Sequence, residues 1–259
     1  TFTNKAAEEM RGRVEQLLES ESPRLWISTF HAFCARLLRR EGPRIGLSRD
    51  FVIYDSVDQL SAVRQAMRDL NVDDKITPPR SLLSRISHAK NRMESASDIR
   101  QNSHGFGDDQ LAAVYERYLQ TLTQSGALDF DDLLLKAVTL FETSDDARAR
   151  YADRFRYVMI DEYQDTNRPQ YMLIRLLTDQ HRNLCVVGDP DQSIYKWRGA
   201  DLRNILDFEE DYPETTVVRL ERNYRSTQVI LDAATNVISR NQNRKEKQLH
   251  AERDGGDPV

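Results

Sequence analysis

Residues 155–167, FRYVMIDEYQDTN, are the stretch that most clearly indicates the fold of this chain. A short apolar run, Tyr157 to Ile160, ends directly in two carboxylates, Asp161 and Glu162, and a polar segment then leads into the helical pattern PQYMLIRLL. An apolar run without alternation predicts a strand buried on both faces, as in a parallel sheet. Because ligands of open α/β sheets bind beyond the carboxyl ends of such strands, the acid pair marks a candidate site.

The acid pair has two interpretations on this stretch alone. One acid could hold a divalent metal near a phosphate while its neighbour orients or deprotonates a water molecule. Alternatively, Asp161 and Glu162 are solvated loop acids.

Three further apolar runs also end in polar clusters. LWI leads into STFH, CVV leads into GDPDQSIYKWRG, and VVRL leads into ERNYRS. The carboxyl ends of parallel strands meet at one edge of a sheet, so four such ends predict a composite site on one side.

The cluster from Gly188 to Ala200 carries the most chemistry. Gln192 can present an amide to a phosphate oxygen, and Tyr195 and Trp197 are followed by Arg198. Paired aromatics beside a cation suit stacking on unpaired bases, worth ~1–3 kcal/mol per base. The alternative is that both aromatics belong to the core.

The other strand ends supply further candidates. Tyr224 could stack on a purine and Arg225 could bind a phosphate, or the two could be a solvated pair at a helix start. Further candidate contact residues lie near the beginning of the chain. They are the aromatic Phe2, the amide Asn4, the hydroxyl Thr29 and the imidazole His31. A histidine in this position is also compatible with a structural role.

Composition bounds the class of protein. The 259 residues have a net charge of −5, and no apolar run approaches the ~20 residues that cross a bilayer. This charge argues against nucleic-acid binding through bulk positive charge, but it allows a locally basic groove. Cys34 and Cys185 lie in apolar contexts without metal-type spacing, which predicts buried thiols in a reducing, cytoplasmic compartment. The chain opens on Thr1 within an apparent strand-to-helix junction, so it reads as part of a longer sequence.

Between residues 56 and 126 the pattern changes to helices only. This predicts a helical insertion in an α/β domain. Its basic helix, with Arg80, Arg85, Lys90 and Arg92, is expected to have a solvated face, although it could lie along a phosphate backbone. The sheet pattern resumes after residue 141 and includes a strand at 217–223, and the tail from residue 241 is expected to hold no core.

Six blocks, in order and spacing, resemble successive motifs of the UvrD/PcrA/Rep family of superfamily 1 DNA helicases. They are TFTNKAAEEM, STFHAFCARLLRR, LDFDDLL, VMIDEYQDTNRPQ, VVGDPDQSIYKWRGAD and LERNYRS. The resemblance implies an α/β, RecA-like P-loop NTPase fold with a parallel sheet. Its domains would be 1A (1–48 and 128–215), a helical 1B-like insertion (49–127) and the start of a second RecA-like domain, 2A (216–259).

The resemblance also implies function. The chain would be part of an ATP-dependent helicase that moves 3′→5′ along single-stranded DNA and unwinds duplex DNA in repair or replication, near the nucleoid and with accessory proteins. Asp161 would bind Mg²⁺ of the nucleotide, Glu162 would activate water, Gln192 would sense the γ-phosphate, Arg225 would be an arginine finger and Tyr224 would stack on adenine. The single-strand contacts would be Phe2, Asn4, Thr29, His31, Phe130, Tyr195, Trp197 and Arg198.

One family motif is missing. No G-x-x-x-x-G-K-[ST] loop occurs in residues 1–259, so we expect this polypeptide by itself to bind ATP poorly and to hydrolyse it negligibly. The strand that bears the loop is missing too, which predicts a partly uncovered sheet edge. Two alternatives remain: a single-strand-binding remnant without ATPase activity, and the motor part of a helicase–nuclease related to RecB and AddA.

Overall fold

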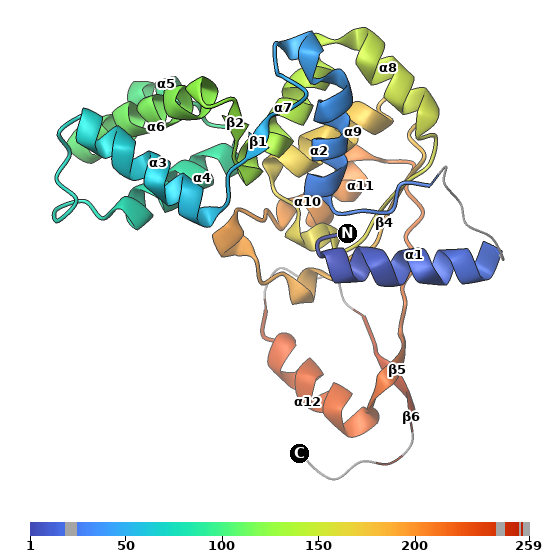
Figure 1. The fold of residues 1–259 in the computed structure, drawn as a ribbon. Helices are drawn as coiled ribbons and strands as arrows, with labels where there is room; N and C mark the ends of the chain where they lie inside the picture. The colour runs from blue at the N-terminus through green and yellow to red at the C-terminus, as the bar shows by residue number, and fades with distance from the viewer. Residues whose placement is uncertain (19–24, 242–246, 254, 256–259) are drawn as a thin grey trace.

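The computed structural model describes residues 1–18, 25–241, 247–253 and 255. Within these ranges the chain is a mixed α/β protein with three short parallel sheets of two strands each (Figure 1). Among these residues no helix combines the length and apolar character that a membrane crossing requires.

The main body consists of seven helices and one of the sheets. Its helices are α1 (Asn4–Leu18), α2 (Phe30–Glu41), α7 (Phe130–Thr143), α8 (Asp145–Arg154), α9 (Arg168–Thr178), α10 (Arg203–Leu206) and α11 (Phe208–Asp211). Strands β3 (Val158–Ile160) and β4 (Leu184–Val186) pair in parallel, as predicted. Helices α2, α7 and α9 supply most of its buried core.

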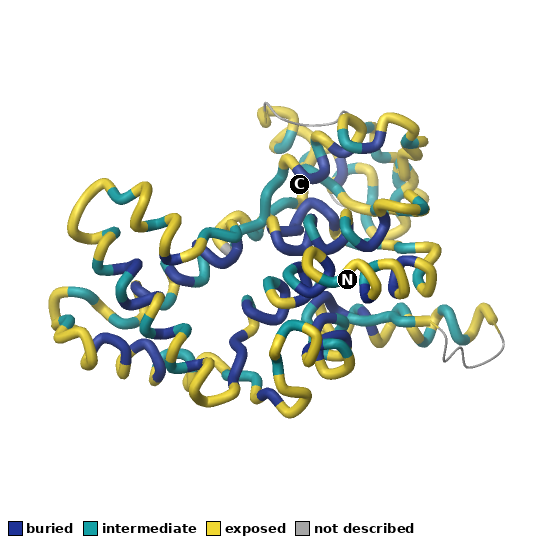
Figure 2. Tube along the Cα trace, turned by 90° about the horizontal axis from the view of Figure 1, so that it is seen from above, coloured by how far each residue is buried: buried dark blue, intermediate teal, exposed yellow. Residues whose placement is uncertain are grey.

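The helical lobe is a second body with its own core, and it comprises α3 (Ser56–Asp69), α4 (Pro79–Asn91), α5 (Ala96–Gln101) and α6 (Phe106–Gln124). Strands β1 (Val52–Ile53) and β2 (Ala127–Leu128) carry the chain into and out of the lobe and pair in parallel (Figure 1). Figure 2 shows buried segments in both bodies. The expectation that this region contains helices only is confirmed.

Side-chain caps fix where several helices begin. Thr29 caps α2, and complete capping boxes start α3 at Asp55, α7 at Asp129 and α9 at Asn167. Such caps satisfy backbone N–H groups that have no partner within the helix. Helix α1 begins with the Thr3 hydroxyl accepting from the N–H of Ala6 at 3.1 Å, so Thr3 provides this cap.

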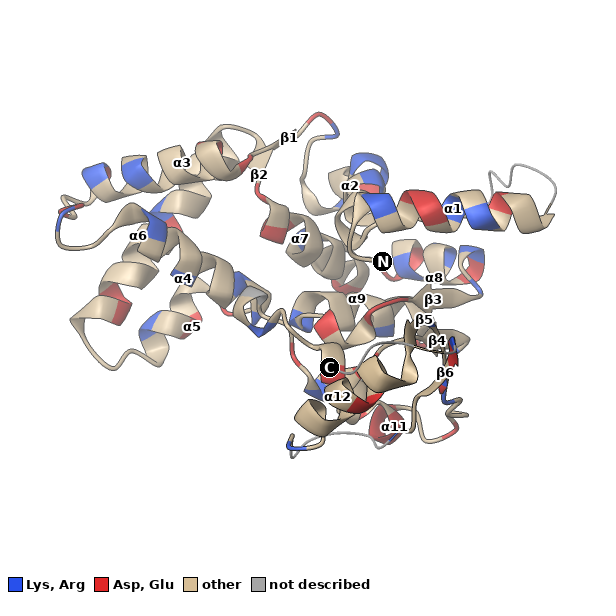
Figure 3. Cartoon of the chain, turned by 90° about the horizontal axis from the view of Figure 1, so that it is seen from below, with Lys and Arg blue, Asp and Glu red and all other residues tan. Residues whose placement is uncertain are grey.

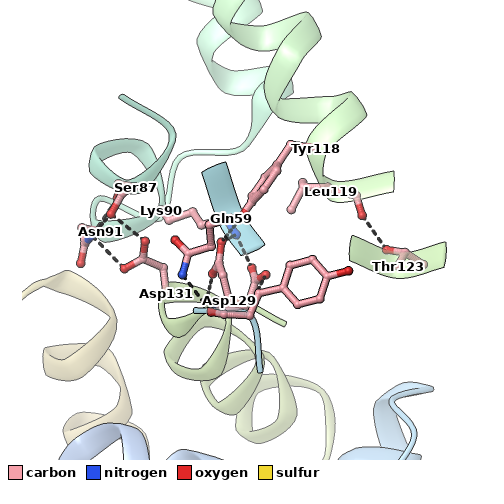
Figure 4. A network of polar contacts seen from close by, with 11 residues as sticks. Gln59, Ser87, Lys90, Asn91, Tyr118, Leu119, Thr123, Asp129 and Asp131 are labelled. Carbon is pink, nitrogen blue, oxygen red and sulfur yellow. Dashed lines mark hydrogen bonds and ion pairs between the residues drawn. The ribbon is translucent and has the colours of Figure 1, made fainter. Parts of the chain in front are cut away.

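A buried ion cluster joins the lobe to the main body (Figure 4). Lys90 of α4 donates to Asp129 and Asp132 at the start of α7, both at 2.7 Å, and the Tyr118 hydroxyl donates to Asp129 at 2.9 Å. The Lys90 side chain is 0% exposed. Burial acts to lower the pKa of Lys90, but the charges of Asp132 and Asp129 outweigh it and raise the pKa. Lys90 therefore belongs neither to a solvated face nor to a phosphate-binding one.

Two predicted strands are wrong. Residues 25–28 form no strand; Trp26 instead packs edge-on against Phe33 and Phe155, with ring centroids 5.6 and 5.1 Å apart. The predicted strand at 217–223 is displaced to β5 (Arg222–Thr227), and residues 217, 218 and 220 lie exposed without a strand partner among the described residues.

The described part of the tail contributes no buried residue to either core, as expected, but it includes a strand that the sequence did not predict. Strand β6 (His250–Arg253) pairs in parallel with β5, and α12 (Gln228–Ile238) packs beside this pair (Figure 1). Tyr224 and Arg225 therefore lie in a strand, not at a helix start.

The prediction that β3 is buried on both faces is also wrong. Val158 and Ile160 pack against the main core, but Met159 is 74% exposed. Its partner across the sheet, Cys185, is exposed as well, contrary to the expectation of a buried thiol, whereas Cys34 is buried. The cause is that helices cover one face of this sheet, while the opposite face has no covering layer among the described residues.

Candidate functional site

The acid pair follows β3 at its carboxyl end, as the sequence predicted. The sheet pairing continues past it, because Tyr163 N–H donates to Val187 O at 2.9 Å. Glu162 has left-handed backbone angles, φ 53° and ψ 42°. A non-glycine residue in this region is strained by ~1–2 kcal/mol, and such strain is concentrated at functional sites. The turn leaves the Glu162 side chain exposed beside the end of β4.

Gln164 connects this acid to the loop after β4. Its side chain is buried, its Nε2 donates to Glu162 Oε2 at 2.7 Å, and its Oε1 accepts from Asp189 N–H at 3.0 Å. Gly188 makes the close approach possible, since a Cβ there would lie 2.6 Å from Gln164 Oε1. Two loops from different strands are thereby held together by one carboxamide.

Asp165 extends the connection to the aromatic residues. Burial raises the pKa of its carboxyl group, and the backbone N–H groups of Tyr195 and Ile194 act against that rise. The Ser193 hydroxyl donates to Gln164 O at 3.4 Å. The segment around the acid pair and the segment bearing Tyr195 therefore form one structural unit.

A cleft of about 900 Å³ lies between the main body and the lobe. The main body lines it with Thr1, Phe2, Thr3, Phe30, His31, Asp131, Asp165, Asn167, Gln170, Tyr195 and Trp197. The lobe lines it with Ser56, Val57, Gln59, Leu60, Ser61, Arg64, Arg80, Leu83, Ser84, Ser87, His88 and Asn91.

Four of the candidate single-strand contacts meet at this cleft. Trp197 is 64% exposed and its ring lies 6.3 Å from that of Tyr195, so the interpretation of Trp197 as a core residue is wrong. Phe2 packs edge-on against Phe30 at 5.9 Å. His31 contacts the half-exposed Phe130 edge-on at the same distance, and burial lowers the pKa of His31. A neutral imidazole in an aromatic wall suits stacking.

The remaining candidates lie elsewhere or are engaged. Thr29 is buried and its hydroxyl accepts from Ala32 N–H at 3.3 Å, while Asn4 is exposed on α1 outside the cleft lining. The Arg198 side chain lies outside the described structure.

The candidates for nucleotide contacts do not line the cleft. Gln192 is exposed and donates to Asp189 Oδ2 at 2.7 Å. Tyr224, 68% exposed, and Arg225 lie on β5, away from the cleft lining.

Asn91 and Asn167 are functional candidates that the sequence analysis missed. Asn167 Nδ2 donates to Asn91 Oδ1, and Asn91 Nδ2 donates to Ser87 O at 2.7 Å and Asp131 Oδ1 at 3.1 Å (Figure 4). Gly199 lies against Asn91 with φ +83°, and a Cβ there would be 2.7 Å from Asn91 Cβ. The motif DEYQDTN contains Asn167, so its final residue was the available signal.

Asp131 predicts a pH effect that can be measured. Burial, and next the charge of Asp129, raise the pKa of Asp131 to about 6. A carboxyl group whose pKa is raised on folding holds its proton longer in the folded state, so this group lowers stability as pH rises from about 4 to 6. We expect Asp131→Asn to gain up to ~3 kcal/mol relative to the parent chain between pH 4 and pH 7.

Urea unfolding of both proteins at the two pH values checks this prediction. All other titrating groups are shared, so the change in the difference reports Asp131 together with its effect on the neighbouring Asp129. A difference independent of pH would contradict it.

The acid pair is compatible with Mg²⁺ held jointly with phosphates. Magnesium is commonly bound through one or two carboxylates together with substrate phosphates, and Asp161 and Glu162 supply two carboxylates at a strand end. Within the described residues no cluster of three or more His, Cys, Asp or Glu side chains is arranged to hold a metal by itself.

The chain is similar in sequence to a known family of proteins. Residues 1–213 match the family model described as the UvrD/REP helicase N-terminal domain. The chain is 48% identical over 259 residues to the ATP-dependent DNA helicase PcrA of Staphylococcus epidermidis, covering all of this chain and 36% of that protein. It is 49% identical over 256 residues to PcrA of Bacillus subtilis, covering 99% of this chain and 35% of that protein. The chain thus spans about a third of the length of these relatives, and it belongs to the UvrD/REP helicase family through that family's N-terminal domain.

Proposed function

We propose that the chain is part of an ATP-dependent DNA helicase that moves along single-stranded DNA. One observation carries this: the buried Gln164 and Asp165 place the strand-end acids in one unit with the aromatic cleft. The names of the PcrA relatives support the same conclusion. They also favour this branch over a helicase–nuclease.

Each residue has a role in this proposal. Asp161 would hold Mg²⁺, which supplies charge neutralisation at the nucleotide phosphates. Glu162, positioned by Gln164, would take the proton of the attacking water, and Gln192, on the adjoining loop, would contact the γ-phosphate. Tyr224 and Arg225 would complete the site from β5 by stacking on adenine and by stabilising the transferred phosphoryl group.

The DNA role belongs to the cleft. Bases would stack on Tyr195, Trp197, Phe2 and His31, with Phe130 behind the imidazole, while Asn4, Thr29 and Arg198 remain candidates by resemblance. We extend the proposal to RecA-like domains 1A (1–48, 128–215) and 2A (from 216), a 1B-like insertion at 49–127, 3′→5′ movement, and cytoplasmic work at the nucleoid in repair or replication with accessory proteins.

Stacking makes a direct prediction for residues 1–259. We expect Trp197→Ala to weaken binding of a fluorescein-labelled 16-nucleotide oligo-dT by about 5- to 100-fold, because one stacked base is worth ~1–3 kcal/mol. Fluorescence anisotropy at 50 mM salt measures the affinity. Tyr157→Ala is the matched control, since Tyr157 is an 82% exposed aromatic that does not line the cleft. Equal affinities for the two variants would refute the DNA role of the cleft.

A further inference from the structure

The lobe presents arginine and serine side chains to the cleft from two helices. On α4 the cleft-lining residues include Arg80, Ser84, Ser87 and His88, spaced by four, three and one positions along a single helical face. On α3, Ser61 and Arg64 line the cleft three positions apart. The wall opposite the aromatic residues therefore carries two guanidinium groups and several hydroxyl groups beside the apolar side chains of Val57, Leu60 and Leu83.

The basic residues of α4 divide by their partners. Arg85 pairs with Asp108 at 2.8 Å, Arg92 pairs with Glu94 at 2.6 Å, and Lys90 is enclosed by its two aspartates. Arg80 and Arg64 line the cleft, are exposed, and make no ion pair with another described residue. The three paired cations therefore do not line the cleft. Arg64 and Arg80, which have no acidic partner among the described residues, do line it.

Acidic groups in the cleft do not neutralise these two arginines. The cleft-lining acids are Asp131 and Asp165, both from the main body. Asp131 accepts from the Ser87 hydroxyl at 2.7 Å and from Asn91, and neither acid forms an ion pair with Arg64 or Arg80. Figure 3 shows basic and acidic residues interspersed over both bodies. Because the chain has a net charge of −5, it can bind phosphates only where basic residues gather locally, as Arg64 and Arg80 do in the cleft.

We propose that Arg64 and Arg80 bind phosphates of the single strand whose bases stack on Tyr195 and Trp197, with Ser84, one helical turn from Arg80, as a hydroxyl donor. This inference rests on the proposed function, because it assigns the second wall of the same cleft. Phosphate contacts position the strand without reading its sequence. The helical lobe therefore takes part in holding the single strand.

Salt dependence tests the inference on residues 1–259. Each phosphate contact to single-stranded DNA contributes about −0.7 to the slope of log affinity against log salt concentration. We expect Arg64→Ala and Arg80→Ala each to weaken binding of 16-nucleotide oligo-dT about two- to fivefold. Each should also make the slope of log affinity against log salt concentration less negative by about 0.7. Arg64→Lys and Arg80→Lys should keep most of the slope, because they keep the charge.

The controls carry the same charge change elsewhere on the lobe. Arg85→Ala and Arg100→Ala remove guanidiniums that pair with Asp108 and Glu116, and we expect each to leave the slope unchanged. If Trp197→Ala weakens binding but Arg64→Ala and Arg80→Ala match these controls, the phosphate wall is refuted and the DNA function stands. If the parent chain does not bind oligo-dT, or binds it independently of Trp197, the proposed function fails and this inference fails with it.

Discussion

Replacing Lys90 with methionine should lower the free energy of unfolding by ~3–5 kcal/mol. The substitution keeps the apolar stem but leaves Asp129 and Asp132 buried without their cation. An uncompensated buried charge is costly because the interior replaces little of its lost hydration. Urea unfolding followed by far-ultraviolet circular dichroism gives the free energy directly.

Two comparisons separate this effect from the loss of any charged side chain. Arg85→Met breaks a partly exposed pair with Asp108 and should cost at most ~1 kcal/mol. The triple variant Lys90→Met, Asp129→Asn, Asp132→Asn removes all three charges and keeps a capping residue at 129, so it should recover most of the loss. If Lys90→Met behaves like Arg85→Met, the buried cluster does not stabilise the joint.

Gln164→Leu should cost ~1–3 kcal/mol and should also weaken single-strand binding. Leucine is close in size to glutamine but leaves the partly buried N–H of Asp189 and the carboxylate of Glu162 without their partner, and a hydrogen-bonding group left unsatisfied away from water costs about this amount. Binding of oligo-dT should weaken by ~0.5–2 kcal/mol, because the loop that bears Tyr195 and Trp197 loses a contact to the acid-pair segment. Urea unfolding and anisotropy measure the two effects on one sample.

Gln192→Leu is the matched control for Gln164→Leu. Both glutamines contact Asp189, but Gln192 is exposed and donates to the carboxylate, so its loss should change stability by less than ~0.5 kcal/mol. Gln164→Glu adds a second test, because it keeps an acceptor for Asp189 N–H while placing a carboxylate beside Glu162. A Gln164→Leu variant with parental affinity for oligo-dT would disprove the connection between the two loops.

The sequence predicted element types where local chemistry decides them. The strands at 158–160 and 184–186 follow from continuous apolar runs, and α9 follows from the apolar helical pattern PQYMLIRLL. No strand forms at 25–28 or 217–221, because an apolar run becomes a strand only beside a pairing partner, which these segments lack among the described residues.

Site residues could likewise be predicted only where the local sequence reveals them. Tyr195, Trp197, Phe2 and His31 were predicted as candidates because they follow predicted strands or lie near the start of the chain, and all four line the cleft. The role of Gln164 was not visible, because it depends on Asp189 lying 25 positions away in the chain. Lys90 appeared as one basic residue among four on α4, and only the packing of α4 against α7 shows that it is buried.

The junction between the lobe and the main body limits how the lobe can be exchanged in evolution or in protein engineering. The chain enters and leaves the lobe through the adjacent strands β1 and β2, a geometry that allows a whole module to be exchanged with little disturbance of the host. The exchange has a condition, since the host retains Asp129 and Asp132 while the module carries away Lys90 and Tyr118. A different lobe would fold stably on this main body only if it placed a cation and a hydrogen-bond donor beside Asp129 and Asp132. The residues on the two sides of this junction are therefore expected to evolve together.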